Sequence, residues 1–408
     1  MDKCRIYTKR CLSFILSIAV VFCSAGGLSF ISFGEENTNP VSGKAVGDTV
    51  QFGSYPQSQV TDKTLISALN GLELNWISYG YYSGDGTEGT AVQRDYMYYC
   101  DIEYDGCMYR GVSFSEFRPQ YTYETTKYIY STINANGFKL DTVYWFKYEP
   151  LNWIVLDPNE GLALCKTVID SQAFSNTVYQ SIGGEYYNTK EYTAYACDYE
   201  SSSVRAWLNG DFYTAAFDES EREYINTAKL DNSADSASSE KYAGADTEDR
   251  VFLLSHRELI TGSYGLIGTS AMKATATEYA EVQGIYYGSS FNANVMWWTR
   301  TETADSNIVA YIGIGGGFET THTVDNASIG IRPALKFAAE TQHNYTSAVT
   351  EPTCTEGGYT TYTCTICGDT YIGGLTEAKG HTVVIDKAVE ATCTQSGLTE
   401  GSHCSVCG

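Results

Sequence analysis

WFKYEPLNWIVLD (residues 145–157) is followed, after Pro158, Asn159 and Glu160, by GLALCKTVID (residues 161–170). The first stretch is rich in aromatic and β-branched residues, which favour strands, the second is largely apolar, and the connection between them is typical of a turn. The pair therefore predicts a β-hairpin. We expect the body of this chain to be built around antiparallel strands.

The sequence before this hairpin predicts one strand and one helix. Residues 46–59 alternate as a short strand, and residues 61–73 place apolar residues at helical spacing behind Asp62. Residues 80–142 are rich in Tyr, Gly and Asp, and we expect irregular strands and a long loop there.

The sequence after the hairpin predicts short helices and further strands. Residues 201–217 have the pattern of a helix, residues 230–249 that of a mobile surface loop, and residues 295–337 that of three or four strands separated by glycines. Two capping-box patterns predict the starts of further short helices: Asp218 with Glu221, and Ser255 with Glu258. These elements together predict an α+β fold of irregular antiparallel strands with a few short helices.

The N-terminus has the pattern of an export signal. Four basic residues precede an apolar run over residues 11–28, and small residues follow. We expect a signal peptide over residues 1–25 with cleavage after Ala25, then a flexible leader over residues 26–42. Cleavage near Gly34, lipidation at Cys23 and an uncleaved anchor helix stay open as alternatives.

The expected location is therefore secreted or cell-surface. The rest of the sequence has no apolar run of the roughly 18 residues that a membrane helix needs, so we expect no membrane span in the mature chain.

Charge limits the partners. The chain has 26 basic and 49 acidic residues, a net charge of −23, and loss of residues 1–25 makes the balance more negative still. Such a charge repels phosphate backbones, so we expect no nucleic-acid partner. A glycan, an extracellular protein or a cation stays open as a ligand, and solubility alone also explains the charge.

Tyrosine is unusually frequent, with 34 copies beside 6 tryptophans. Aromatic side chains can stack on sugar rings in a wet groove, and Tyr81, Tyr82 and Tyr98 are our candidates for such contacts. Alternation of Tyr with small polar residues is equally typical of a half-exposed strand.

The C-terminal tail carries one cysteine pattern twice. In each copy a lone Cys precedes a C-x2-C pair, and a histidine stands at the head, His343 or His381. The six cysteines are Cys354, Cys364, Cys367, Cys393, Cys404 and Cys407. Three thiols and an imidazole form a typical zinc set, so we expect one zinc site per copy; disulfides across the copies are the alternative. His381 could instead complete the first site.

The two copies define repeats over residues 340–380 and 381–408, and the second ends directly after its C-x2-C-G turn. We expect this repeat to be truncated. A unit of this size lacks a core large enough to fold alone. We therefore expect a cross-link through a metal or a disulfide.

Five phrases occur in a familiar order: VGDTVQFGSYPQS, VRAWLNGDFYTAAF, RVFLLSHREL, MWWTRT and IGIRPALKF. Over residues 45–338 the body resembles a domain of unknown function common in exported proteins of Gram-positive anaerobes. Its closing pattern is also distantly similar to the sulfatase-modifying fold, a variant of the C-type lectin fold. The tail resembles Cys-rich repeats of bacterial surface proteins. We therefore expect a lectin-like domain over residues 43–339.

This resemblance implies roles for the closing strands. Trp297, Trp298, Arg300 and Arg332 become internal supports of the fold. Adjacent strand residues face opposite ways, so the two tryptophans cannot both point into one core, and a ligand platform at one of them stays open as an alternative; Trp297 is our candidate for it. The related formylglycine-generating enzymes use cysteines near the end of their fold. Since no cysteine lies between Cys197 and Cys354, we expect the body not to be an enzyme.

Four cysteines lie in the body: Cys100, Cys107, Cys165 and Cys197. In an oxidising compartment we expect Cys100 and Cys107 as the disulfide candidate, while Cys165 fits a buried thiol equally well. Four aspartates could hold calcium or form a solvated loop: Asp231, Asp235, Asp246 and Asp249.

The sequence thus predicts a non-catalytic surface module that recognises a polysaccharide or a protein. An enzyme derived from the sulfatase-modifying fold and a structural spacer in a surface array are the alternatives.

Overall fold

A computed structural model describes residues 39–79, 97–122, 131–236, 239–266, 268–286, 294–338, 345–365, 368 and 370–408. The predicted signal peptide and residues 26–38 of the leader lie outside the described residues. Asn39 already belongs to the folded body, since its Nδ2 donates to the carbonyl oxygen of Ala338 at 2.5 Å. Val41 is only 1% exposed in the main core. The sequence placed the start of the folded body at Gly43, and the structure shows that it begins a few residues earlier.

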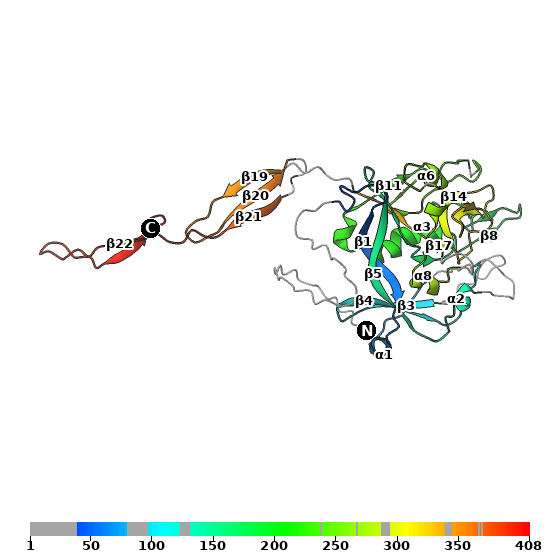
Figure 1. Ribbon diagram of the computed structural model, residues 1–408, viewed down its shortest axis with the longest axis horizontal. Helices are drawn as coiled ribbons and strands as arrows, with labels where there is room; N and C mark the ends of the chain where they lie inside the picture. The colour runs from blue at the N-terminus through cyan, green and yellow to red at the C-terminus, as the bar shows by residue number, and fades with distance from the viewer. Residues whose placement is uncertain are drawn as a thin grey trace. The chain divides into compact units, whose positions relative to one another are not determined.

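The body has the predicted α+β class, with mostly antiparallel strands and short helices (Figure 1). Its larger sheet has the order β10-β18-β6-β5-β4-β3-β2, with β1 added on β5 and β13 on β18. The strands are β1 (Thr49–Gln59), β2 (Ile77–Ser78), β3 (Met97–Tyr104), β4 (Cys107–Phe114), β5 (Tyr144–Asp157), β6 (Leu162–Cys165), β10 (Ile225–Asn226), β13 (Val251–Phe252) and β18 (Ala334–Phe337).

Strand β5 is the centre of this sheet. It pairs with β1 along most of its length, with β4 near its start and with β6 near its end. The β5–β6 pairing confirms the predicted hairpin. Gly161 closes its turn at φ +68°, and a Cβ there would lie 2.3 Å from the carbonyl oxygen of Phe337, so the turn requires glycine.

The region expected to be irregular contains a regular hairpin. Strands β3 and β4 pair over eight residues, from Met97↔Phe114 to Tyr104↔Cys107. Asp105 and Gly106 form the turn at φ 50° and 70°, as a two-residue hairpin turn requires. The expectation of irregular strands was wrong for this segment, whereas residues 80–96 and 123–130 lie outside the description.

The second sheet has the order β16-β15-β14-β17-β7. Its strands are β7 (Asp170–Ser171), β14 (Trp297–Glu302), β15 (Val309–Ile312), β16 (Phe318–Glu319) and β17 (Gly330–Ile331). Trp297 and Trp298 are both fully buried, although they point to opposite faces of β14. Both faces of this strand are therefore covered, and both tryptophans are internal, so the alternative in which one of them is exposed as a ligand platform was wrong.

The helices begin at the predicted capping residues. Asp62 caps α1 (Lys63–Asn70), and complete capping boxes open α5 (Glu219–Arg222) and α6 (His256–Ile260). The predicted helix over residues 201–217 is α3 (Ser203–Trp207), a π-helical turn η1 (Leu208–Phe212) and α4 (Tyr213–Ala216). The remaining short helices of the description are α2 (Thr132–Ala135), α7 (Thr269–Met272) and α8 (Glu278–Val282).

The predicted mobile loop is anchored at both ends. Strands β11 (Ala228–Leu230) and β12 (Thr247–Asp249) pair, and the Asn232 and Tyr242 side chains are buried. The small hairpin of β8 (Tyr179–Gln180) and β9 (Tyr186–Tyr187) lies earlier in the chain. The aspartates weighed as calcium ligands contact other partners: Asp231 pairs with Arg257, Asp235 with His256, Asp249 with Arg205, and Asp246 accepts the Asn232 N–H.

The tail forms two small sheets. The first joins β19 (Tyr345–Thr350), β20 (Gly358–Cys364) and β21 (Thr370–Thr376), and the second joins β22 (Val383–Asp386) and β23 (Gly401–Cys404). Among the described residues, no helix has the length and apolar content required to cross a membrane.

Candidate metal centre

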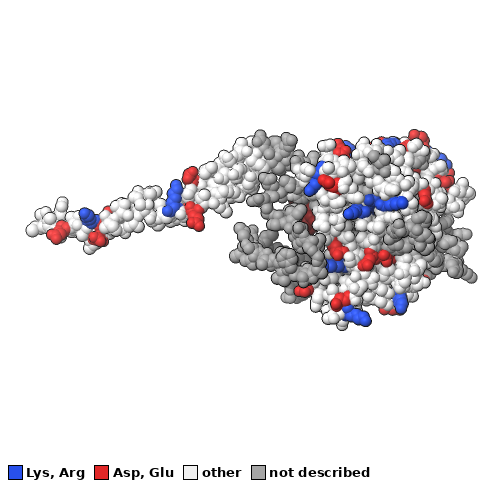
Figure 2. Space-filling view, viewed as in Figure 1, with Lys and Arg blue, Asp and Glu red and all other residues white. Residues whose placement is uncertain are grey.

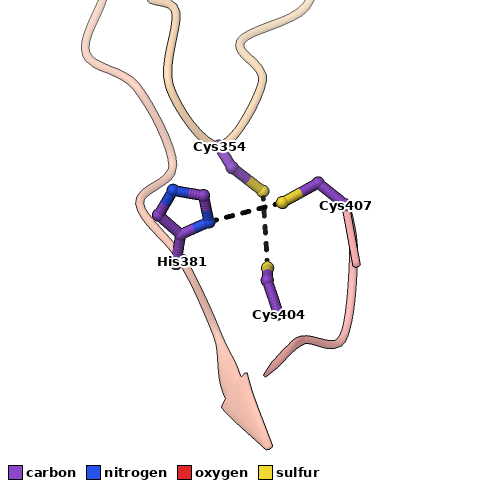
Figure 3. Close-up of side chains that lie close together, drawn as sticks. All are labelled: Cys354, His381, Cys404 and Cys407. Atoms are coloured by element: carbon purple, nitrogen blue, oxygen red, sulfur yellow. Dashed lines mark hydrogen bonds between the residues drawn. The ribbon is translucent and has the colours of Figure 1, made fainter. Parts of the chain in front are cut away.

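Four tail residues converge on one point: Cys354, His381, Cys404 and Cys407 (Figure 3). One potential ligand atom of each lies within 4.8 Å of the others. The Sγ atoms of Cys354 and Cys404 are 3.8 Å apart, and Cys407 Sγ is 3.3 Å from His381 Nδ1. Three sulfurs and one imidazole nitrogen at these separations suit a tetrahedral metal ion.

Local structure positions the first ligand. Cys354 lies in the turn between β19 and β20, where Thr353 Oγ1 accepts the N–H groups of Thr355 and Glu356. This hydroxyl turn fixes the backbone on both sides of the thiol. The Thr353 carbonyl accepts the N–H of Lys379 at 2.9 Å, which brings the segment before His381 to this turn.

The other three ligands come from the second repeat. His381 precedes β22, and Cys404 is the last residue of β23. The N–H of Ser405 donates to the Thr382 carbonyl and that of Gly408 to the Cys404 carbonyl, which closes the C-x2-C turn. The β22–β23 pairing therefore places both thiols of this turn beside the imidazole.

The ligand set crosses the boundary between the repeats. The sequence predicted a second site of His381, Cys404, Cys407 and Cys393, and the structure brings the first three together. Cys393 is exposed and lies outside the cluster, and Cys354 of the first repeat takes its place. The assignment of Cys393 to this site was wrong.

The predicted first site is only partly described. His343 and Cys367 lie outside the described residues, and Cys364 is buried at the end of β20. Its third cysteine, Cys354, belongs to the cluster with His381. The alternative was that His381 completes the first site. In the structure His381 does join a cysteine of the first repeat, Cys354, but the other two cysteines of the cluster come from the second repeat.

The environment of the thiols favours a bound cation. Hydrogen bonds from the backbone N–H groups of Val406 and Cys407 lower the pKa of Cys404 to about 5. A hydrogen bond from the Cys407 thiol to the Cys404 sulfur raises the pKa of Cys407 to about 11, because it stabilises the protonated thiol. A divalent ion would replace that proton and hold both groups as thiolates.

The body residues predicted to bind a ligand do not form one site. Tyr81 and Tyr82 lie outside the described residues. Tyr98 is half-buried on β3, paired with Ser78 and Ser113. Trp297 has no exposed surface; its Nε1 donates to the Met272 carbonyl at 3.0 Å and Arg332 lies over its ring at 5.0 Å. Trp297 is therefore an internal support, and its assignment as a ligand platform was wrong.

The body cysteines are free thiols. Cys100 pairs with Gly111 and Cys107 with Tyr104, so the two candidates lie four positions apart in the β3–β4 register. That offset exceeds the Cα separation of a disulfide, and the expected Cys100–Cys107 bond is not formed. Cys165 and Cys197 are buried. For Cys165 this agrees with the interpretation as a buried free thiol.

Part of the body is similar to a known protein family. Residues 166–338 match a protein-family profile described as a domain of unknown function (DUF6273). No curated protein and no solved structure matches the chain. The predicted resemblance to a domain of unknown function is confirmed for this segment, which contains the second sheet and the strands β10, β13 and β18 of the first.

Proposed function

We propose that this chain is an exported surface protein in which a zinc ion joins the two tail repeats and the body recognises an extracellular ligand without catalysis. The observation that carries the proposal is the convergence of Cys354, His381, Cys404 and Cys407 from two repeats. A three-cysteine, one-histidine set is typical of structural zinc, which has no open coordination position for catalysis.

The tail has a physical need for such an ion. Many apolar side chains of the two small sheets are exposed, among them Ile372, Leu375 and Val383, so these sheets bury little apolar surface. A unit of this kind gains its folding free energy from a cross-link. Zinc bound to residues of both repeats would supply that cross-link.

Metal analysis of the full chain tests this proposal. Protein purified with zinc should hold one ion at the described cluster, and Cys404→Ser should lower zinc content and affinity by at least about tenfold. Cys393→Ser is the matched control, because this thiol lies outside the cluster. Zinc-free protein with Cys354 oxidised, or equal zinc loss in both variants, would contradict the proposal.

The surface charge and the buried cysteines support a binding role for the body. On the face shown in Figure 2, acidic and basic side chains are interspersed on a largely uncharged surface. The thiols Cys100, Cys165 and Cys197 are buried, and burial raises the pKa of Cys100 and Cys165 to about 11, which disfavours the reactive thiolate. These features favour a body that recognises a ligand, as lectin-like domains do, over a body that acts as an enzyme of the formylglycine-generating type.

Binding of the full chain to a panel of neutral glycans and extracellular proteins tests the body. Saturable binding by the folded protein is the expected result. Thiol-dependent turnover of a substrate that is lost in Cys165→Ser or Cys197→Ser would favour the enzyme. No binding to any panel member would favour a structural spacer.

A further inference from the structure

The body holds a polar cavity of about 390 Å³ beside the helical segment of α3 and η1. Strand β12 and the residue after it, Arg250, contribute to the lining with Thr227. A volume of this order lies within the range of small-ligand sites in proteins. The cavity falls inside the segment that matches the domain of unknown function.

Hydrogen bonds join the polar side chains at the floor of the cavity. Asp249 is 2% exposed and accepts hydrogen bonds from Arg205 Nε at 2.7 Å, Asn209 Nδ2 at 3.2 Å and Thr247 Oγ1 at 2.8 Å. Arg205 also donates to the Glu200 carbonyl at 2.9 Å. The side chains at the floor are therefore held before any ligand arrives, which lowers the entropic cost of binding.

An irregular helix shapes the same wall. The chain passes from α3 into the π-helical turn η1, which contains Asn209. Asn209 Oδ1 accepts the Arg250 N–H at 2.8 Å, and its Nδ2 donates to the Val251 carbonyl at 2.9 Å. A π-helical turn is rare and occurs frequently at functional sites, which is a second feature pointing to this cavity.

The lining selects the chemistry of the ligand. Nine of the ten residues that line the cavity are polar or charged, with Ala206 as the exception, so the wall offers many hydrogen-bonding groups to a polar ligand. The exposed rim offers the Glu200 and Glu248 carboxylates as acceptors and the Arg250 guanidinium as a donor. A sugar hydroxyl both donates and accepts, so neighbouring hydroxyls can satisfy both kinds of group.

Charge separates a neutral sugar from charged ligands. Asp249 pairs with Arg205, and Lys229 Nζ lies 3.7 Å from Glu248, so that with Glu200 and Arg250 the charges around the rim balance and favour neither an anion nor a cation. We propose that this cavity binds a neutral saccharide unit, and that Glu200, Glu248 and Arg250 hydrogen-bond its hydroxyls. This inference rests on the proposed binding role of the body and assigns it a site.

Calorimetric titration of the full chain tests the assignment. The probes are neutral hexose oligomers and N-acetylhexosamine oligomers, with polylysine as a cationic peptide probe. Glu200→Gln and Arg250→Ala should each weaken binding of the preferred oligomer by about tenfold, the loss expected for one charged hydrogen bond. Glu103→Gln and Lys139→Ala, exposed on other parts of the body, are the matched controls. Unchanged melting temperatures show that all four variants fold.

The outcomes separate this inference from the proposed function. Oligomer binding that is unaffected by the rim variants, or is lost only in Tyr98→Ala, would overturn the cavity as the site and leave the binding role intact. Polylysine binding that depends on the rim would overturn the saccharide as the ligand. No binding of any probe would overturn this inference, and absence of every ligand on the wider panel would overturn the binding role.

Discussion

The sulfur atoms of Cys354 and Cys404 lie 3.8 Å apart, although 50 positions separate these residues in the sequence. One belongs to the turn of the first repeat and the other to the last strand of the second. The cluster that could hold a metal ion therefore takes residues from both repeats. If the proposed ion is bound there, a repeat cut at its sequence boundary would lack one ligand.

Substitution of Cys354 tests this arrangement. Cys354→Ser removes one of four ligands, so zinc affinity should fall by at least about tenfold, whereas Cys393→Ser should leave it unchanged. Competition with a chromogenic chelator measures both affinities on the full chain. If Cys393→Ser weakens binding and Cys354→Ser does not, the site lies within the second repeat alone.

Metal removal should loosen the connection between the repeats. Without the ion, the described links there include the Lys379–Thr353 backbone hydrogen bond and the Lys379–Glu351 pair at 4.0 Å, which is exposed and weak. Chelation should therefore speed proteolysis near residues 377–380, and added zinc should reverse this. Equal cleavage rates with and without chelator would show that the metal does not hold the repeats together. Cys354→Ser protein should be cleaved quickly under both conditions.

Glycine 161 and glycine 106 offer a matched pair of substitutions. Both have positive φ, but a Cβ at Gly161 would lie 2.3 Å from the Phe337 carbonyl, whereas none of the described atoms lies within 4 Å at Gly106. Gly161→Ala should lower the free energy of unfolding by about 3 kcal/mol or more, and Gly106→Ala by about 1 kcal/mol. Urea denaturation of the two variants measures the difference. Equal losses would mean that the β5–β6 turn can relax away from β18.

Local patterns in the sequence predict much of the fold. Strands β5 and β6 and the capped helices follow from apolar spacing and from capping residues such as Asp218 and Ser255, because these signals act within a few residues. The β3–β4 hairpin was missed although Asp105-Gly106 is a strong turn signal, since its strands alternate Tyr with polar residues. Trp297 was misassigned because its cover comes from residues distant in the sequence, such as Met272.

The metal centre shows a different limit. Thr392 Oγ1 accepts the N–H groups of Thr394 and Gln395, as Thr353 does in the first repeat. The turns that carry Cys354 and Cys393 are therefore alike locally, and the donor residues can be read from the sequence. Which thiol reaches His381 depends on the path of the chain between the repeats, which no local pattern encodes.

Arginine 332 should be sensitive even to a conservative change. It is 1% exposed, lies over the Trp297 ring at 5.0 Å and donates to the Cys165 carbonyl at 2.8 Å. Lysine cannot reproduce the planar contact or the fork of donors, so Arg332→Lys should lower the free energy of unfolding by about 3 kcal/mol. Arg250→Lys, at an exposed position, should change it by less than about 0.5 kcal/mol. Similar small effects for both would show that Arg332 does not support the sheet.

Glutamate 302 should make stability depend on pH. It is 5% exposed on β14, and its Oε1 has no hydrogen-bond partner among the described residues. Burial, with a smaller contribution from Asp235, raises its pKa from 4.5 to about 7. A carboxyl with a raised pKa in the folded state favours folding below about pH 4.5, and this contribution is lost as the pH rises toward 7.

Glu302→Gln should therefore raise the free energy of unfolding by about 2 kcal/mol at pH 8.5 and change it little at pH 4.5. Urea denaturation at the two pH values measures both, with the exposed Glu248→Gln as control. A stabilisation equal at both pH values would show that removal of the buried charge is not its cause.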